Sequence, residues 1–267
     1  MLLPLLAKMK LSLNGMNDLY HETKIVKDIW LSENLGKNCF HIDIGTDYKT
    51  EIIKLINDIN EVIFIDAKVS TTNIKLLHYL QSIKFRVVDC SISFSVRKCE
   101  SYPELNQNIV VRKANKDDLE DVLRIASSSF AFSRFHQDPN ISLDVANKIK
   151  REWAHNFFRS LRGDLMYVAS YEKFKNIVGF ILLRHNQKNS FGKEVIIDLI
   201  ATDRKFMGRG VGRSLLKEMF KNESQKCLFK VGTQISNIPA ISLYSKFGFI
   251  LKESNYVLHF HRNICKI

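Results

Sequence analysis

The spacing of apolar residues makes the first part of the chain harder to interpret than the second. In that first part, strands are predicted over residues 39–44, 62–66 and 85–96, and helices over residues 49–60 and 72–83. Residues 1–47 show no other sustained period. Residues 101–108 are polar and contain Tyr102-Pro103, so they are predicted to form a linker between two domains.

After residue 108, short apolar runs alternate with amphipathic segments. Strands are predicted over residues 109–113, 165–171, 177–184, 194–201, 228–233 and 249–260, and helices over residues 117–129, 212–222 and 239–246. A longer helix is expected after Ser142, with Leu143, Ile149, Trp153, Phe157 and Leu161 on its apolar face. Asn115 and Ser142 are suited to cap helices.

This order of elements predicts the fold class. Alternation of strands and helices is typical of a mixed central sheet with helices on both faces, and the apolar run Glu194–Ala201 suits a central strand. We therefore expect a main α/β domain over residues 109–262. A smaller, non-catalytic N-terminal α/β domain is expected over residues 1–100, with the linker at 101–108 between them.

A faint internal repeat links the two parts. Asn73-Ile74 precedes Phe85 at the spacing with which Asn237-Ile238 precedes Phe249, and each pair spans a helix that leads into a strand. Three matches leave chance and duplication both open. Under duplication the N-terminal domain is a degenerate half-copy, in which Leu80 stands where the second copy has Tyr244, and no chemistry is assigned to it.

Composition excludes several classes of protein. The 267 residues are 45% hydrophobic and 25% charged, as in ordinary globular proteins, and no apolar run approaches the roughly 20 residues of a membrane-spanning helix. The apolar start, residues 1–6, is too short for a signal peptide, and Met16 is an alternative start. Five cysteines without a C-x-x-C motif indicate reduced thiols and a cytoplasmic location.

The positive charge is unevenly distributed along the chain. Residues 1–150 hold 20 Lys and Arg against 19 Asp and Glu, whereas residues 151–267 hold 20 against 9, of a total net charge of +12. No long basic helix or basic stripe with interleaved aromatic residues appears, which disfavours a nucleic-acid partner. A solvated basic surface and a small phosphorylated ligand both fit this excess.

The strongest local signal is Met207-Gly-Arg-Gly-Val-Gly-Arg213, between a predicted strand and a predicted helix. Glycines allow close approach of the backbone to a ligand, and the N-terminus of the helix favours an anion. Neither G-x-x-x-x-G-K-[ST] nor G-x-G-x-x-G is present. The loop therefore predicts a diphosphate site to which Arg209 and Arg213 add charge.

A second motif lies in the last predicted helix. In Asn237-Ile-Pro-Ala-Ile-Ser-Leu-Tyr244, Asn237 can cap the helix and Pro239 suits its first turn. Tyr244 lies two turns after the cap, on the same face. A lone helical tyrosine is usually a core residue, but behind a phosphate loop it becomes a candidate catalytic group.

The two motifs together resemble those of the GNAT N-acetyltransferases, over about residues 109–262. The resemblance implies the GNAT fold and acetyl-CoA as the acetyl-donor co-substrate, with no metal. Met207 departs from it, since most members carry Gln or Arg there. The implied general acid is Tyr244. The implied coenzyme contacts are Ile200, Ala201, Gly208, Arg209, Gly210, Val211, Gly212, Arg213, Leu216 and Asn237, and the sheet is expected to splay after Ile200.

A narrower likeness concerns the acceptor. Residues 130–135, 231–237 and 254–256 resemble segments of bacterial GNAT enzymes that acetylate the 4-amino group of dTDP-amino sugars for surface polysaccharide synthesis. The implied substrate is a nucleotide-linked amino sugar of the dTDP-4-amino-4,6-dideoxyhexose type, attacked directly in a ternary complex. The candidate substrate contacts are Arg134, Thr233 and Gln234. The particular sugar, dTDP against UDP, and a homodimer are left open.

The sequence also contains candidate general bases and a pair of histidines, and it leaves other functions open. Asp198, Glu194 and His136 are candidate general bases, but none is assigned. His259 and His261 share a strand face, yet two ligands do not make a metal site. The alternative functions are acetylation of a protein N-terminus, a lysine or a polyamine, and a non-catalytic acyl-CoA-binding domain.

Overall fold

The structure is a computed structural model that describes residues 22–46, 48–59, 61–97, 108–173, 176–188, 192–223 and 227–262. The chain divides into two compact units, which are described separately. One is formed by Met1–Val87 with Val257–Ile267, and the other by Val88–Tyr256. Residues 101–107 of the expected linker and both candidate start residues lie outside the described residues.

The first unit is a small α/β sheet. Its elements are β1 (Lys24–Lys27), α2 (Ile29–Leu35), β2 (Asn38–Asp43), α3 (Tyr48–Asn57), β3 (Ile63–Ser70) and α4 (Ile74–Ser82). Strand β2 pairs antiparallel with β1 and parallel with β3, and the C-terminal half of β10 adjoins β3. The sequence did not predict β1 and α2. Helix α2 is only seven residues long, between a capping Asp28 and a left-handed Gly36.

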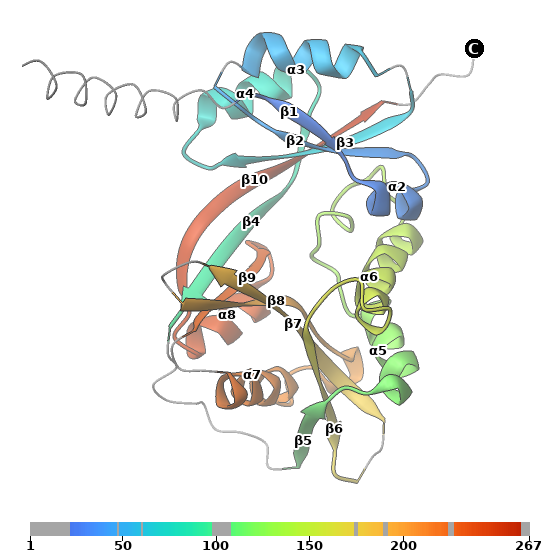
Figure 1. Cartoon of the computed structure of the whole chain (residues 1–267), viewed down its shortest axis with the longest axis vertical. Helices are drawn as coiled ribbons and strands as arrows, with labels where there is room; N and C mark the ends of the chain where they lie inside the picture. Colours follow the sequence, from blue (N-terminus) through green and yellow to red (C-terminus); the bar gives the residue numbers. More distant parts are fainter. Residues whose placement is uncertain are drawn as a thin grey trace, which may run out of the picture. The chain divides into compact units, whose positions relative to one another are not determined.

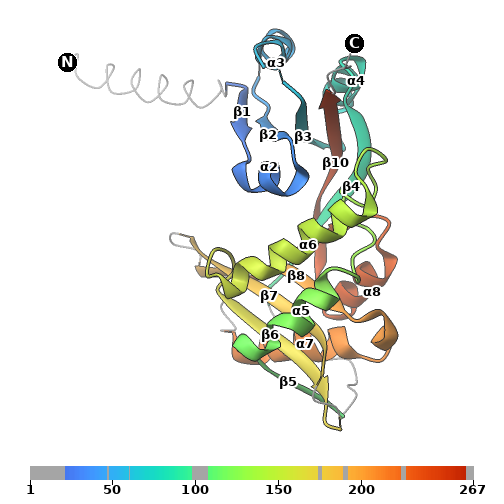
Figure 2. The same ribbon diagram turned by 90° about the vertical axis from the view of Figure 1, so that its right-hand side faces the viewer.

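The second unit is the mixed sheet that the sequence predicts. Its strands are β4 (Arg86–Val96), β5 (Ile109–Lys113), β6 (Leu165–Tyr171), β7 (Ile177–Lys188), β8 (Gly192–Thr202), β9 (Leu228–Gln234) and β10 (Ile250–Arg262), in the order β10-β4-β9-β8-β7-β6-β5. Its helices are α5 (Leu119–Ala126), α6 (Leu143–Phe158), α7 (Val211–Asn222) and α8 (Ile238–Lys246), with 3₁₀ turns η2 (Lys116–Asp118) and η3 (Arg204–Phe206). Helices α5 and α6 cover one face and α7 the other (Figures 1 and 2).

The long strands β4 and β10 cross the division between the units. Residues 88–96 of β4 belong to the second unit, where β4 pairs antiparallel with β9, and residues 257–262 of β10 belong to the first. The boundaries expected from sequence assigned each strand to a single domain. Those boundaries were placed at the predicted linker, whereas the extent of each strand is set by the strands to which it is hydrogen-bonded.

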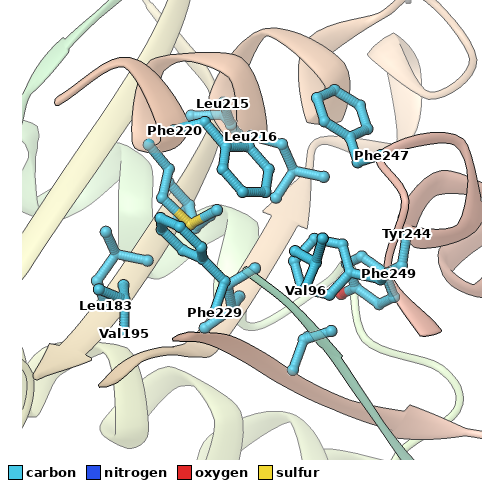
Figure 3. Close-up of a cluster of buried hydrophobic side chains, with 14 of the residues drawn as sticks. Val96, Leu183, Val195, Leu215, Leu216, Phe220, Phe229, Tyr244, Phe247 and Phe249 are labelled. Carbon is cyan, nitrogen blue, oxygen red and sulfur yellow. The ribbon is translucent and has the colours of Figure 1, made fainter. Parts of the chain in front are cut away.

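The core of the second unit lies between the sheet and helices α7 and α8. Leu215, Phe220, Phe229 and Phe247 are buried there, with the rings of Phe220 and Phe229 centred 4.5 Å apart (Figure 3). A second cluster fills the opposite face beneath α5 and α6. Burial of these large apolar side chains, each worth roughly 1.5–3 kcal/mol, fixes α7 and α8 against the sheet.

The expected apolar face of α6 is wrong at both ends. Leu143 is 64% exposed and Leu161 is 72% exposed. The helix ends at Phe158 because Ser160 adopts a left-handed backbone (φ 57°) and the N–H of Leu161 turns back to the carbonyl of Asn156. The cap at Ser142 is confirmed, since its hydroxyl accepts from the N–H of Val145.

The two segments of the internal repeat have the same local geometry. Asn73 caps α4 and Asn237, 164 residues later, caps α8, each with its side-chain oxygen. Lys84 (φ 74°) and Gly248 (φ 77°) end the two helices in the left-handed region. The following strands also begin 164 residues apart. Three details at one offset favour duplication over chance.

No helix among the described residues combines the length and the apolar character needed to cross a lipid bilayer.

Candidate functional site

The predicted phosphate loop connects β8 to α7. Turn η3 follows Asp203, whose carboxylate caps it, and the glycines come next. Gly208 (φ 75°) and Gly210 (φ 94°) both lie in the left-handed region, where other residues are strained. The sequence therefore uses glycine here for its backbone conformation.

The N-terminus of α7 is open to an anion. The first intrahelical bond runs from the N–H of Ser214 to the carbonyl of Gly210, so the N–H groups of Val211, Gly212 and Arg213 precede it. The N-cap residue, Gly210, has no side chain that could cap these groups. The Arg209 guanidinium lies over the ring of Phe206, 5.5 Å from its centre. The loop thus combines the backbone donors of a helix start with positive charge, which suits a diphosphate.

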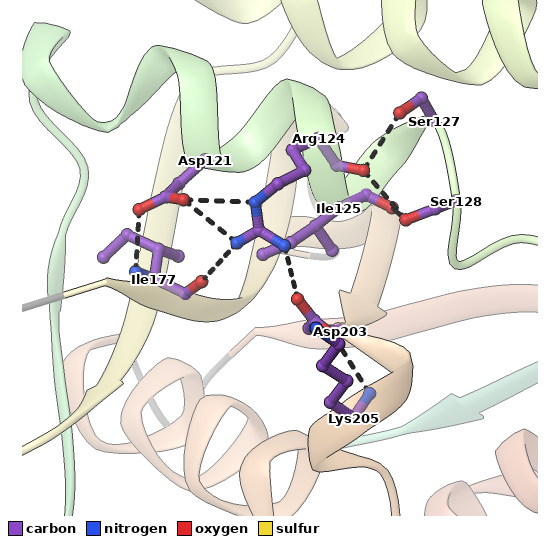
Figure 4. Close-up of polar contacts among 8 residues, drawn as sticks. All are labelled: Asp121, Arg124, Ile125, Ser127, Ser128, Ile177, Asp203 and Lys205. Atoms are coloured by element: carbon purple, nitrogen blue, oxygen red, sulfur yellow. Dashed lines mark hydrogen bonds and ion pairs between the residues drawn. The ribbon is translucent and has the colours of Figure 1, made fainter. Parts of the chain in front are cut away.

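A salt-bridge network anchors the start of this loop to the opposite face of the sheet. Arg124 on α5 pairs with Asp203 and, at 2.9 Å, with Asp121, and it donates to the carbonyl of Ile177 at the start of β7 (Figure 4). Asp121 also accepts from the N–H of Ile177. The network therefore fixes the position at which β8 ends and the loop begins.

The sheet splays between β8 and β9, as the sequence predicts, but earlier than expected. The parallel pairing ends at Ile197 and Val231, three residues before Ile200. Beyond this point, among the residues that the structure describes, β9 pairs only with β4, up to Gln234, and β8 pairs only with β7. One edge of each strand is therefore free of strand partners, as required for a ligand that pairs with backbone groups.

A small pocket with a volume of about 90 Å³ opens at this splay. Its walls are the ends of β8 and β9, helices α6 and α8, and the connection between α5 and α6. The polar side chains that line it belong to Ser133, Lys150, Asp198, Thr233, Gln234, Asn237 and Tyr244.

Tyr244 belongs to both the pocket and the core. It is only 2% exposed, and its ring packs against Phe94 and Phe249, with centres 6.2 and 5.7 Å away (Figure 3). Burial raises the pKa of the Tyr244 phenol well above its usual value. The phenol is therefore protonated at neutral pH and can act as a proton donor.

The remaining predicted residues divide between pocket, loop and core. Ile200, Thr233, Gln234 and Asn237 line the pocket, and Asn237 bonds Thr233 (3.2 Å) while its oxygen caps α8. Outside the glycine loop, three predicted residues do not line it. Ala201 and Leu216 are buried in the core, and Arg134 follows the lining residue Ser133 in the chain, with its guanidinium 4.7 Å from the centre of the Phe135 ring.

Two of the three candidate bases are engaged in ion pairs. Asp198 accepts two hydrogen bonds from Arg162, at 2.6 and 2.7 Å, and one from Trp153 at 2.9 Å. Glu194 pairs with Lys230 at 2.7 Å. Both carboxylates are therefore already engaged by cationic side chains.

The surroundings of the third candidate, His136, favour its neutral form. Burial chiefly lowers its pKa, with help from the charges of Lys150 and Arg204. Its Nε2 lies 3.1 Å from the side-chain oxygen of Asn147 and its Nδ1 lies 2.6 Å from the hydroxyl of Ser133. Both nitrogens are thus occupied within the protein.

Sequence reasoning missed two residues of the site. Lys150 lines the pocket from α6, where a lysine in an amphipathic helix resembles any surface lysine. Gly179 on β7 leaves room for α7, since a Cβ there would lie 2.5 Å from Val211 at the helix start. Glycine within an apolar strand was the available signal for that close approach.

Comparison with known proteins agrees with this geometry. The sequence profile of the acetyltransferase (GNAT) family matches residues 122–249. The chain is also 27% identical over 240 residues to the spore coat polysaccharide biosynthesis protein SpsD of Bacillus subtilis, covering 86% of this chain and 80% of that protein.

Solved structures share the fold at low sequence identity. A conserved protein of unknown function from Staphylococcus epidermidis aligns with a TM-score of 0.61, 13% identity, and coverage of 91% of this chain and 93% of its own. A GCN5-related N-acetyltransferase from Sphaerobacter thermophilus aligns with a TM-score of 0.55, 10% identity, and coverage of 90% and 76%. With its glycine loop, splayed strands and family match, the part of the chain over residues 122–249 belongs to the acetyltransferase (GNAT) family, and the protein is an acyltransferase.

Proposed function

We propose that this protein transfers the acetyl group of acetyl-CoA to the amino group of a nucleotide-linked amino sugar. The observation that carries the proposal is the pocket at the splay of β8 and β9, which joins a proton donor, Tyr244, to a cationic acceptor side. The similarity to SpsD supports a role in polysaccharide biosynthesis.

The coenzyme would be held by the loop and the two strands. The N–H groups at the start of α7, with Arg209 and Arg213, fit its diphosphate, and the free edges of β8 and β9 fit its amide-bearing arm. Acetyl-CoA supplies an activated acyl carbon. The chain itself binds, aligns the reactants and supplies a proton from Tyr244.

The loop assignment predicts how the protein responds to acetyl-CoA. A ligand that binds only the folded state raises Tm, so acetyl-CoA is expected to raise it. Arg213→Glu places negative charge beside the diphosphate and should weaken binding at least ~10-fold, with a correspondingly smaller shift in Tm. Lys221→Glu, at the other end of α7, is the matched control and should keep the full shift. Equal shifts in both variants would refute the loop assignment.

We place the acceptor against the wall of the pocket that Lys150 forms, which we call the acceptor side. The charges of Arg134 and Arg162 help burial to lower the pKa of Lys150, and the charge of Asp198 opposes them, so two further cations act on this wall. Such a site favours an anionic acceptor and disfavours a polyamine, because like charges repel. A diphosphate-linked amino sugar meets this requirement.

The test is a thiol-release assay with acetyl-CoA and a panel of amines. We expect turnover with dTDP- or UDP-linked 4-amino sugars, and little with polyamines or lysine peptides. Preferential turnover of a peptide or polyamine would refute the sugar-nucleotide acceptor and leave the acyltransferase assignment standing. Binding of acetyl-CoA without turnover of any amine would favour a non-catalytic role.

We further propose that the first unit is a degenerate half-copy without a coenzyme site. Strand β2 ends at Asp43 and α3 begins at Tyr48, whereas β8 ends at Thr202 and α7 begins only at Val211. Leu80, buried like Tyr244, occupies the position of the tyrosine. We also propose the expected cytoplasmic location, since Cys39, Cys90 and Cys227 form no disulfide among the described residues.

A further inference from the structure

Lys150 is a nearly buried lysine with an unusual environment. It is 8% exposed and lines the pocket from α6. Its Nζ lies 4.6 Å from the centre of the Trp153 ring and 5.0 Å from that of Phe130. Within the described residues no hydrogen bond or ion pair to this nitrogen is found. A buried lysine without a carboxylate partner is costly to keep charged, so it calls for a functional explanation.

The neighbouring acid does not neutralise Lys150. Asp198 already accepts from Trp153 and, in a bidentate pair, from Arg162. The charged and titratable groups around Lys150 come from β8, from both ends of α6 and from the pocket wall. They are Asp198, Arg134, Arg162, His136 and Tyr244.

This environment favours the neutral amine. Burial lowers the pKa of Lys150 to about 8, the charges of Arg134 and Arg162 act in the same direction, and Asp198 opposes them. A group with that pKa is about one-tenth neutral at pH 7 and about half neutral at pH 8. A general base works best when its pKa lies near the working pH.

We propose that Lys150 is the general base that takes the proton from the acceptor amine. The proposal rests on the proposed acetyl transfer to an amine. It is supported by the shared pocket, in which Lys150 stands on the acceptor side and Tyr244 at the splay. It also fills the role for which Asp198 and Glu194 are unsuited because both are held in ion pairs.

The acceptor reacts as a neutral amine. Its nitrogen forms a bond to the thioester carbon, and the carbon–sulfur bond breaks. The nitrogen loses one proton to Nζ of Lys150, and the sulfur gains one from the hydroxyl of Tyr244. Lys150 then returns its proton through solvent to the phenolate, so that amine and thioester have become amide and thiol. The rings of Trp153 and Phe130 stabilise the ammonium that forms in between.

Two substitutions separate a base from a binding cation. Lys150→Met keeps the length and apolar stem of the side chain but cannot accept a proton. Lys150→Arg keeps the positive charge and stays protonated. If Lys150 is the base, both variants should lose kcat by about 10²-fold or more, with KM changed little. Lys148→Met, on an exposed position of the same helix, is the control and should keep the wild-type kcat.

The pH profile supplies a readout that a structural role would not change. At saturating acceptor, wild-type kcat should rise with pH and level off above about pH 8, because the neutral amine is the active form. This rise of kcat with pH, the pH limb, should be lost in Lys150→Met. If acetyl-CoA raises the Tm of each variant as much as it raises that of the wild type, both variants are folded.

Two results would overturn the proposal: kcat within a few-fold of wild type in Lys150→Arg with a raised KM in Lys150→Met, or an unaltered pH limb in Lys150→Met. The first would make Lys150 an anion-binding residue. The assay uses whichever amine the wild-type protein acetylates, so a wrong acceptor in the proposed function is recognised separately, by the acceptor panel on wild type.

Discussion

Replacing Tyr244 by Phe is expected to lower kcat by about 10²-fold or more while acetyl-CoA affinity changes little. The substitution keeps the ring that packs against Phe94 and Phe249 and removes only the hydroxyl. Burial raises the pKa of this phenol, so the wild-type group is protonated throughout the neutral range and available to the leaving thiolate. The measurement is kcat by thiol release, with affinity taken from the acetyl-CoA-dependent shift in Tm.

The matched control for this experiment is Tyr167→Phe. Tyr167 is also 2% exposed, and burial raises its pKa too, but it lies on β6 outside the pocket. Its loss should leave kcat near the wild-type value. If Tyr244→Phe lowers affinity and kcat equally, the tyrosine shapes the pocket and does not donate a proton.

Features of the site that depend on local sequence could be predicted. The glycine loop, the cap at Asn237 and the start of α8 follow from residues that are neighbours in the chain, so their spacing carried the information. The splay was expected from the family resemblance, but its starting point was not. The extent of pairing between β8 and β9 depends on contacts between strands that sequence spacing does not encode.

Features that depend on residues distant in the chain were not predicted. Lys150 differs from the exposed Lys148 only in what surrounds it, and those surroundings come from β8 and from the connection before α6. Asp198 was a plausible base until Trp153 and Arg162 were found to occupy it. In each case the chemistry of the residue is set by partners that helix or strand periodicity cannot reveal.

The acceptor preference can be expressed as a ratio of specificity constants. Nucleotide-linked amino sugars are expected to exceed the free sugars by at least ~10²-fold in kcat/KM, which corresponds to roughly 2.7 kcal/mol. The diphosphate gains charge-assisted hydrogen bonds that a free sugar lacks, and these contacts hold the amine in line with the thioester. Added salt should reduce the ratio, since exposed charges are screened within about 10 Å at 0.1 M.

Arg134 is the residue we expect to carry part of this preference. It follows the pocket-lining residue Ser133 in the chain, and its charge lowers the pKa of Lys150. Arg134→Ala should therefore reduce the ratio of nucleotide-linked to free sugar and move the pH limb of kcat upward, with acetyl-CoA binding unchanged. Measuring the ratio well above pH 8, where Lys150 is neutral in both proteins, separates the two effects. Arg159→Ala, which removes a half-exposed arginine paired with Glu152 at the end of α6, should alter neither quantity. A ratio that survives Arg134→Ala would assign the diphosphate to other residues, because a lost charge-assisted contact must appear as lost preference.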